Sequence, residues 1–372
     1  MKYIISGGGT GGHIYPALAI LDEIKRRDDK AQILYVGAKG SMEERLAKER
    51  GLDFKTIRVS PMPRKINKEF FASSYEVLRG LFQSLSLVKD FDPDVIIGTG
   101  GFVTGPIVLA GALRKKKTLI HEQNSLPGIT NRILSKFVDR ACLTYESSVT
   151  YFAHPDRTII TGNPIRSSFF TEDTKKDYGK YGLKDGLKTV LVFGGSNGSK
   201  RLNESLVDMI NKADDMGFQM IIGTGKASYE DFIEKTKNSK FLDKLSINAY
   251  LDDIASAYRL ADLVISSSGA ISLAEISAMG LPSILIPKAY TAENHQEFNA
   301  RTYMDQGASQ MILEAELDWY KLYENIEKIL SNDTALRVMG QNSKKFAKAQ
   351  ATSDIVDEID KLIEGGKDGK SK

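Results

Sequence analysis

Lys2-Tyr-Ile-Ile-Ser-Gly-Gly-Gly-Thr-Gly-Gly-His13 opens the chain and passes directly into the helical pattern that starts at Pro16. A similar turn, Thr189-Val-Leu-Val-Phe-Gly-Gly-Ser-Asn-Gly-Ser199, opens the second half. An apolar strand that ends in glycines lets backbone N–H groups approach an anion, and the next helix points its positive dipole end at the same place. Both loops are therefore predicted to bind phosphate, and two such units would face a cleft for a nucleotide ligand.

The same alternation of strand and helix continues through both halves, which is typical of parallel sheets. First-half strands are predicted at Tyr3–Ser6, Ile33–Val36, Phe54–Arg58, Val95–Ile97, Thr118–His121 and Ala141–Leu143. Second-half strands are predicted at Thr189–Phe193, Gln219–Ile222, Leu245–Ala249, Leu263–Ser266 and Ser283–Ile286. The predicted class is α/β, with two Rossmann-like doubly wound domains at 1–164 and 165–346. A last helix is expected over about 347–364, and the composition of 365–372 predicts a disordered tail.

Length and composition limit the number of domains and the classes of function that are expected. At 372 residues the chain is long enough for about two domains. A net charge of +3 does not favour a nucleic-acid partner. The single cysteine, Cys142, excludes intramolecular disulfides and fits a reducing compartment. No secretory signal is visible. The uncharged stretch Val95–Leu113 is interrupted by glycines, so it is interpreted as a strand, a loop and a buried helix rather than a membrane span.

Two nucleotide-site classes are disfavoured. Gly7, Gly9 and Gly12 match the dinucleotide pattern Gly-x-Gly-x-x-Gly, but the second strand ends at Tyr35-Val-Gly-Ala-Lys39 without the carboxylate that would hold a ribose. A nicotinamide or flavin cofactor is therefore not expected. The second loop lacks the Gly-Lys-Ser/Thr order of the phosphate-binding loop in ATP-hydrolysing enzymes, so ATP hydrolysis is not expected either.

Polar residues gather where predicted strands end. His13, at the start of a helix, can remove a proton from a hydroxyl group, or it can simply hydrogen-bond its loop. His121-Glu-Gln-Asn124 follows a strand, at the edge where open α/β sheets bind ligands. His121 and Glu122 lack further spaced ligands, so no metal site is predicted.

The second half offers a carboxylate and several amides. Glu275 lies about one turn inside a predicted helix, where it can accept both hydroxyls of a ribose or merely complement the helix dipole. The segment Asn294-His-Gln-Glu-Phe-Asn299 supplies amides suited to sugar hydroxyls.

Over nearly its whole length the chain resembles the MurG family, glycosyltransferase family 28. The resemblance rests on Gly8–His13 with Pro16, Gly100–Pro106, His121–Asn124, Thr161–Arg166, Gly194–Ser196, and Ser268–Ala270 with Glu275. Phe102 stands where a tyrosine is common, and His295 where glutamine is frequent. A hydroxyl at position 102 is therefore not essential here.

The resemblance implies a GT-B fold whose final helix crosses back onto the first domain. It implies inverting transfer of N-acetylglucosamine (GlcNAc) from UDP-GlcNAc to the C4 hydroxyl of N-acetylmuramic acid (MurNAc) in lipid I, giving lipid II for peptidoglycan. No cofactor or metal is then required beyond the substrate UDP-GlcNAc. Alternatives are another GT-B enzyme, such as a glycolipid synthase or a UDP-GlcNAc 2-epimerase, and a non-catalytic membrane scaffold that binds UDP-sugar.

The resemblance also implies roles for individual residues. His13 would be the general base, and Glu122 could replace or orient it. The remaining donor-site assignments are Thr10, Gly11 and Gly12 in the first loop, Arg166 and Ser196 at the diphosphate, Glu275 at the ribose, Leu251, Ala270 and Ile271 at the uracil, and Asn124, His295 and Gln296 at GlcNAc. Thr10 and His13 would line the acceptor side.

A lipid acceptor implies a peripheral protein at the cytoplasmic face of the bacterial cell membrane. Apolar residues at helical spacing with basic neighbours predict a docking surface of Lys65, Lys68, Phe70, Phe71, Leu78, Leu81 and Phe82. The basic run Arg114–Lys117 would add attraction to anionic lipid. The alternative is a helix that buries this face on its own sheet. Lipid I, the anionic surface and other cell-wall synthesis and division proteins are the expected partners, and nucleic acid is not.

Overall fold

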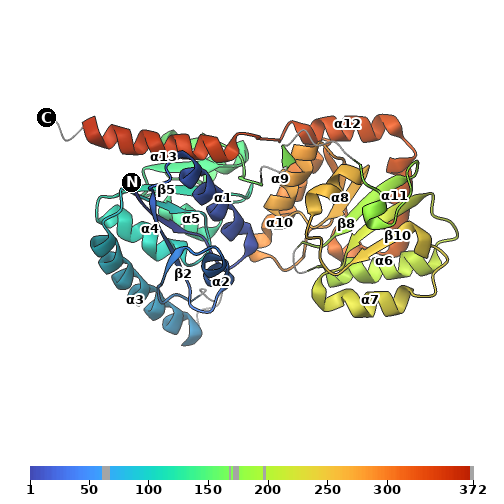
Figure 1. Cartoon of the computed structure of the whole chain (residues 1–372), viewed down its shortest axis with the longest axis horizontal. Coiled ribbons are helices and arrows are strands. Elements are labelled where there is room, and N and C mark those ends of the chain that lie inside the picture. Colours follow the sequence, from blue (N-terminus) through green and yellow to red (C-terminus); the bar gives the residue numbers. More distant parts are fainter. Residues whose placement is uncertain (61–67, 167–168, 171–175, 196–197, 369–372) are drawn as a thin grey trace. The chain divides into compact units, whose positions relative to one another are not determined.

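The computed structural model describes residues 1–60, 68–166, 169–170, 176–195 and 198–368, with the backbone alone at 68–71, 292 and 366–368. The chain divides into two compact units (Figure 1). Unit 1 consists of Met1–Arg166 and Lys348–Lys372, and unit 2 of Ser167–Ala347. The boundary predicted after residue 164 falls two residues before the division at 166, in the same Pro-Ile-Arg segment.

Unit 1 is built on a parallel sheet with the order β3-β2-β1-β4-β5-β6-β7. Its strands are β1 (Lys2–Ser6), β2 (Gln32–Gly37), β3 (Asp53–Thr56), β4 (Val95–Gly98), β5 (Lys117–Glu122), β6 (Arg140–Leu143) and β7 (Thr158–Ile160). Its α-helices are α1 (Gly11–Arg27), α2 (Met42–Glu49), α3 (Lys68–Phe91), α4 (Thr104–Leu113), α5 (Ile129–Leu134) and α13 (Ala351–Asp368). This order is that of a doubly wound α/β domain.

Strand β1 shows how one sheet serves two cores. Successive side chains of a strand point to opposite faces. Tyr3 and Ile5 therefore join the hydrophobic cluster that α1 and α13 cover. Ile4 joins the cluster on the other face, beneath α3, α4 and α5. A strand buried on both faces must be apolar throughout, which explains the unbroken apolar run before the first glycines.

Helix α13 packs on α1, and both lie within unit 1 (Figure 1). Its buried face, Ile355, Val356 and Ile359, completes the cluster beneath α1. On its outer side, Arg27 of α1 donates to Asp357 at 2.6 Å. The helix continues to Asp368, so residues 365–368, which were predicted to begin a disordered tail, are helical, and the rest of that prediction lies outside the described residues. Extending a formed helix costs far less than starting one, and even glycine adds only about 1 kcal/mol.

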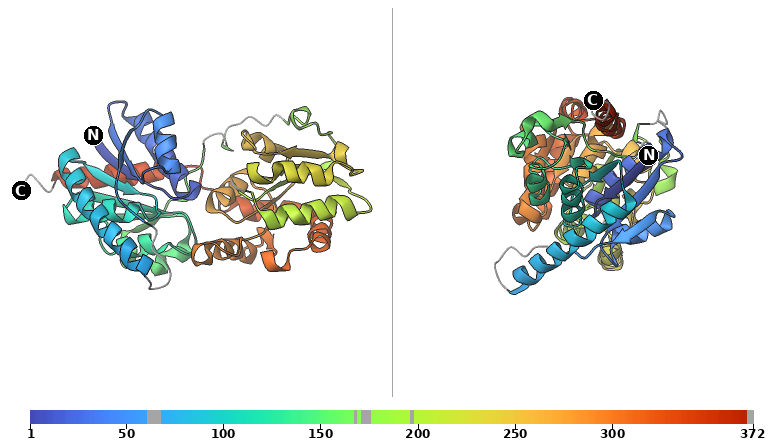
Figure 2. Two further views of the ribbon diagram at one scale, coloured as in Figure 1. Left: turned by 90° about the horizontal axis from the view of Figure 1, so that it is seen from below. Right: turned by 90° about the vertical axis from the view of Figure 1, so that its left-hand side faces the viewer.

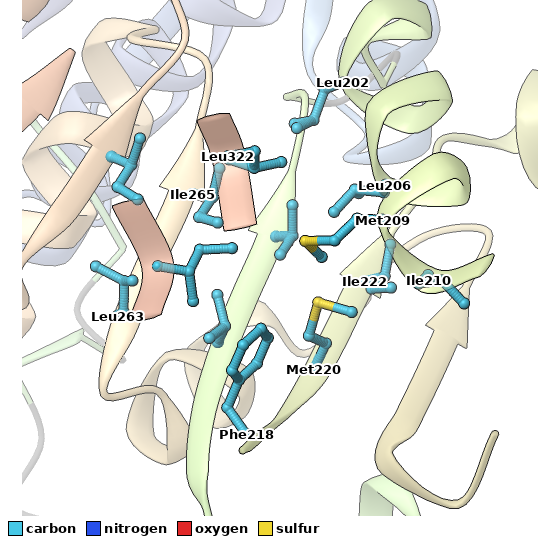
Figure 3. Packing of buried hydrophobic residues seen from close by; sticks show 14 of the residues in the cluster. Leu202, Leu206, Met209, Ile210, Phe218, Met220, Ile222, Leu263, Ile265 and Leu322 are labelled. Atoms are coloured by element: carbon cyan, nitrogen blue, oxygen red, sulfur yellow. The ribbon is translucent and has the colours of Figure 1, made fainter. Parts of the chain in front are cut away.

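Unit 2 repeats the architecture with the parallel order β10-β9-β8-β11-β12-β13. Its strands are β8 (Lys188–Phe193), β9 (Phe218–Gly223), β10 (Leu245–Asn248), β11 (Leu263–Ser266), β12 (Ser283–Leu285) and β13 (Ser309–Met311). Its α-helices are α6 (Lys200–Lys212), α7 (Tyr229–Thr236), α8 (Ile254–Leu260), α9 (Ala270–Met279), α10 (His295–Asp305), α11 (Trp319–Leu330) and α12 (Asp333–Lys344). Figure 3 shows Leu206 and Met209 of α6 packed over Met220 and Ile222 of β9.

The predicted strands are all present, with ends displaced by at most two residues. Two edge strands were not predicted, β7 and β13, because each has only three residues and β13 reads Ser-Gln-Met. The stretch Val95–Leu113 forms β4, a glycine turn and α4, as expected. Within the described residues, no helix is both long and apolar enough to cross a membrane.

We predict that Ile355→Ala lowers the free energy of unfolding by about 2–5 kcal/mol, because it opens a cavity in a fully buried cluster. Chemical denaturation followed by circular dichroism measures this change. The only tryptophan, Trp319, belongs to unit 2 and reports on that unit by fluorescence. We expect the tryptophan transition to move less than the circular dichroism transition.

The matched control is Glu364→Ala, which alters an exposed position of the same helix. It should change the free energy by about 0.5 kcal/mol or less. Equal effects of the two substitutions would show that α13 is not part of the unit 1 core.

Candidate functional site

Each sheet reverses its strand order at one point, between β1 and β4 in unit 1 and between β8 and β11 in unit 2. Ligands of open α/β sheets bind at the carboxyl ends of the strands at such a point. The first glycine loop follows β1, and the second follows β8. The motif Ser267–Gly269 follows β11 and leads into α9. The motifs found in the sequence thus lie at the binding edges of the two sheets.

The turns after β1 and β4 cross in direct backbone contact. The N–H of Gly8 donates to the carbonyl of Gly100 at 3.3 Å. A Cβ added to Gly101 would lie 2.1 Å from the carbonyl oxygen of Gly8, so no other residue fits there. Gly101 also has a φ of +86°, which glycine adopts without strain. This crossing places the residues after β4 beside the start of α1.

A carboxylate of the chain itself occupies part of the first glycine loop. Glu43 of α2 is buried, and it accepts hydrogen bonds from the N–H of Gly9 at 3.4 Å and of Ala38 at 3.2 Å. A phosphate at Gly8 and Gly9 would meet this negative charge. The prediction that the whole first loop binds phosphate is therefore corrected: its donors for an anion are confined to the start of α1, from Gly11 onward.

His13 lies in the first turn of α1 with one ring nitrogen held by two oxygens. Its Nδ1 is 3.1 Å from the carbonyl oxygen of Thr99 and 3.0 Å from the Oε1 of Gln123. Carbonyl oxygens only accept, so Nδ1 carries a proton. The Nε2 of the neutral ring then keeps its lone pair, and it has no hydrogen-bond partner among the described residues. The ring can therefore accept a proton at Nε2.

Glu122 makes no hydrogen bond to His13 within the described structure, and its role as an alternative base stays a prediction. It is buried at the end of β5 and serves the loop that follows. Its Oε1 accepts from the backbone and side-chain nitrogens of Asn124, and its Oε2 accepts from Gly128 and Asn131. All four donors belong to residues 124–131, so they hold the carboxylate against the segment that follows β5. Glu122 thereby orients Asn124.

The other predicted residues of unit 1 follow the carboxyl ends of its strands or end its first segment. Asn124 is half-buried and held by Glu122, and Gly11 and Gly12 form the start of α1. Thr10 and Arg166 are exposed. Arg166 ends the first of the two segments that make up unit 1.

In unit 2, Glu275 is buried one turn inside α9 and accepts a hydrogen bond from the hydroxyl of Tyr258 at 3.3 Å. The predicted uracil residues lie along the same edge of the sheet. Ala270 is the first residue of α9 and Ile271 the second. Leu251 packs near Gly223 at the end of β9.

Gln296 connects two strand ends. Its backbone carbonyl accepts from the hydroxyl of Ser268, after β11, at 2.6 Å, and its Oε1 accepts from the N–H of Lys288, after β12, at 2.9 Å. The side-chain NH₂ of Gln296 remains as a donor. His295 begins α10 and is half-buried. The predicted diphosphate residue Ser196 lies outside the described residues.

Lys288 was missed by the sequence analysis. Its Nζ donates to the carbonyl of Gly198 in the second glycine loop at 2.7 Å, and burial lowers the pKa of this amine. A cation against a loop that is predicted to bind phosphate would complement an anionic ligand. The sequence held one indication of a role for Lys288, which is its position two residues after the predicted strand Ser283–Ile286, where ligands of parallel sheets bind.

The predicted docking helix divides into two faces. Tyr75, Leu78 and Phe82 recur at helical spacing and are exposed, Leu78 at 55% and Phe82 at 70%. Leu81 was predicted to be on this surface, but it packs with Leu85 against the unit 1 core. Leu81 is a neighbour of Leu78 on the helix surface, but it lies on the side shared with Ser84 and Val88, which are fully buried.

Figure 2 shows α3 reaching out from unit 1 at its N-terminal end. Lys68, Phe70 and Phe71 belong to α3, but their side chains lie outside the described residues, as does the whole of Lys65. In the predicted basic run, Arg114 and Lys115 are exposed, whereas Lys116 pairs with Asp92.

No group of three or more His, Cys, Asp or Glu side chains in the described part of the chain is arranged to hold a metal ion. At the end of β5, the carboxylate of Glu122 makes the four hydrogen bonds given above, and the Nε2 of His121 lies 2.9 Å from the carbonyl oxygen of Gly162.

Comparison with known proteins identifies the family. Residues 3–143 match the glycosyltransferase family 28 N-terminal domain, and residues 189–358 match the family's C-terminal domain. A relative from Finegoldia magna is 46% identical over 98% of this chain and 99% of its own length. It is named UDP-N-acetylglucosamine–N-acetylmuramyl-(pentapeptide) pyrophosphoryl-undecaprenol N-acetylglucosamine transferase.

Solved structures share the fold. MurG of Acinetobacter baumannii superimposes with a TM-score of 0.78 at 24% identity, covering 97% of this chain and 99% of that one. A UDP-GlcNAc 2-epimerase from Neisseria meningitidis, bound to UDP-GlcNAc, superimposes with a TM-score of 0.67 at 13% identity, covering 97% of this chain and all of that one. These likenesses confirm the predicted GT-B fold. Together with the matches over both halves and the full-length identity, they place the chain in glycosyltransferase family 28.

Proposed function

We propose that the protein transfers GlcNAc from UDP-GlcNAc to the C4 hydroxyl of MurNAc in lipid I, forming lipid II for peptidoglycan. The relative that is 46% identical over its full length carries the name of this activity. The geometry of His13 carries the chemical argument, because Nδ1 is held by two oxygens and Nε2 keeps a lone pair. Structures related at 13% identity support only a common fold, so they do not favour an epimerase.

The proposed reaction is a single displacement. The C4 oxygen of the muramyl sugar attacks the anomeric carbon of GlcNAc as the bond from that carbon to the UDP oxygen breaks, which inverts α to β. The hydroxyl proton passes to Nε2 of His13, and UDP leaves with the bonding electrons. General-base assistance of this kind typically contributes about 10²–10⁴-fold to the rate.

Unit 2 supplies the proposed donor contacts. The buried carboxylate of Glu275 accepts the ribose hydroxyls, and the NH₂ of Gln296, which donates to no other described group, donates to a GlcNAc hydroxyl. The side-chain amide of Asn124 is the GlcNAc contact proposed for unit 1. Negative charge that develops on the leaving diphosphate is met by N–H groups of the second glycine loop, by Arg166 and by Lys288. Leu251, Ala270 and Ile271 enclose the uracil.

The exposed face of α3, with Tyr75, Leu78 and Phe82, is the proposed membrane-docking surface. Arg114 and Lys115 are exposed cations that directly follow α4, and α4 packs against α3. Each basic residue near an anionic surface adds about 1 kcal/mol of attraction. We propose a peripheral location at the cytoplasmic face of the cell membrane, where lipid I is bound.

We predict that His13→Ala lowers turnover by about 10²-fold or more, because the proton of the acceptor hydroxyl loses its base. The assay follows labelled GlcNAc from UDP-GlcNAc into a short-chain lipid I analogue, with UDP release measured with and without acceptor. The matched control is His154→Ala, a second histidine of unit 1 outside the site, which should leave turnover unchanged. UDP release without acceptor would contradict the transferase, and full activity of His13→Ala would contradict the base.

We predict that Glu275→Ala removes discrimination between ribose and deoxyribose. Wild-type protein should bind UDP about ten-fold or more tighter than 2′-deoxy-UDP, because the charged carboxylate accepts the 2′-hydroxyl. In Glu275→Ala the two affinities should become equal, as titration calorimetry can measure.

Glu324→Ala is the control for this experiment, since Glu324 is an exposed carboxylate of unit 2 on α11. It should keep the wild-type preference. A preference that survives in Glu275→Ala would remove Glu275 from the ribose site.

We predict that Leu78→Ser combined with Phe82→Ser weakens binding to vesicles that contain anionic lipid by about ten-fold or more, because two exposed apolar side chains lose their burial in lipid. Vesicle flotation measures the bound fraction. The control pair, Leu242→Ser with Tyr320→Ser, removes comparably exposed apolar side chains from unit 2. Equal loss in both pairs, or equal binding to neutral and anionic vesicles, would count against the docking surface.

A further inference from the structure

The side-chain amide of Gln123 is buried between two histidines, and only one orientation satisfies its surroundings. Its Nε2 lies 2.8 Å from the carbonyl oxygen of Thr99 and 3.3 Å from that of His121. Backbone carbonyls only accept hydrogen bonds, so the NH₂ end must face them. The other end, Oε1, therefore faces Nδ1 of His13.

His121 continues this chain of hydrogen bonds. Its Nδ1 lies 2.9 Å from the Nε2 of Gln123, so it must accept a hydrogen bond and carry no proton. Its Nε2 must then be protonated, and it donates to the carbonyl of Gly162 at 2.9 Å. Burial lowers the pKa of His121 to about 4, so the ring is neutral at physiological pH, as an accepting Nδ1 requires.

We propose that Gln123 and His121 are positioning residues that hold His13 as its Nδ1–H tautomer and so present Nε2 as the base. This inference rests on the function proposed above, because it concerns the same proton transfer. The proton of the acceptor hydroxyl moves to Nε2, and the proton on Nδ1 stays between the oxygens of Thr99 and Gln123. Both oxygens then stabilise the imidazolium that forms.

Backbone groups anchor both ends of the chain of hydrogen bonds. The backbone of Thr99 is fixed because the N–H of this residue donates to the carbonyl of Ser6, the last residue of β1, at 2.9 Å. The N–H of Gly162 donates to Leu143 of β6 at 3.1 Å. A reversed amide would place Oε1 of Gln123 2.8 Å from the oxygen of Thr99, where two acceptors repel. The backbone therefore selects the amide orientation, and the amide selects the tautomer of His13.

The tautomers can be measured directly on the wild-type protein without substrate. The chain has four histidines, so a two-bond ¹H–¹⁵N spectrum of histidine-labelled protein is simple to assign by single substitutions. We expect opposite tautomers, with the proton on Nδ1 in His13 and on Nε2 in His121. A proton on Nε2 of neutral His13, or the same tautomer in both rings, would overturn the proposal.

Gln123→Met keeps the approximate length of the side chain but removes both hydrogen-bonding ends. We expect kcat for transfer to the lipid I analogue to fall by at least about ten-fold with KM for UDP-GlcNAc nearly unchanged, as for other bases held in the wrong tautomer. The His13 spectrum should gain the Nε2–H form. The control Gln341→Met, at an exposed position of α12, should change neither.

Gln123→Glu keeps an acceptor oxygen opposite Nδ1, and only its protonated form can also donate to the carbonyl of Thr99, so the Nδ1–H form and part of the lost kcat should return toward the acidic end of the assay range. A fall in kcat with an unchanged His13 tautomer would indicate a merely structural role and overturn the proposal. The two proposals can fail separately. Opposite tautomers without GlcNAc transfer would contradict the proposed function and support the positioning, whereas transfer with a reversed tautomer would contradict the positioning alone.

Discussion

At the reversal of strand order in unit 1, the turns after β1 and β4 touch through their backbones. The contact is so close that a Cβ at position 101 would clash with the carbonyl oxygen of Gly8, so only glycine fits there. This contact brings the carbonyl of Thr99, which follows β4, to the first turn of α1. His13 is held there by that carbonyl. The candidate base of the protein thus depends on a crossing that only glycine permits.

Buried polar side chains organise the rest of this edge. An unpaired carboxylate or amide would be costly to bury, so each one must find partners, and those partners are backbone groups of the adjoining loops. Glu122 holds the loop that carries Asn124, and Glu43 holds the first glycine loop. Gln123 links His121 to His13. Buried polar groups here set the shape of the ligand-facing loops and the protonation of one ring.

The two units share a strand order but differ in what their glycine loops meet. In unit 1, the carboxylate of Glu43 accepts from Gly9, which disfavours a phosphate at that point. In unit 2, the ammonium of Lys288 lies against Gly198, which favours one. Similar turns in the sequence therefore lie beside side chains of opposite charge, because residues distant in sequence set the local charge.

The sequence by itself determined the elements that local chemistry controls. Apolar runs ending in glycine, such as the one before Gly7, specify a strand, a turn and a helix, and their repetition predicts two parallel sheets. The polar residues after the strands, including His13 and Glu275, were likewise visible as candidates. The folded chain was needed to show which groups Glu122 accepts from and that Leu81 packs against the core. Such roles depend on contacts between segments far apart in the chain, and spacing along the sequence does not encode which groups those contacts bring within hydrogen-bonding distance.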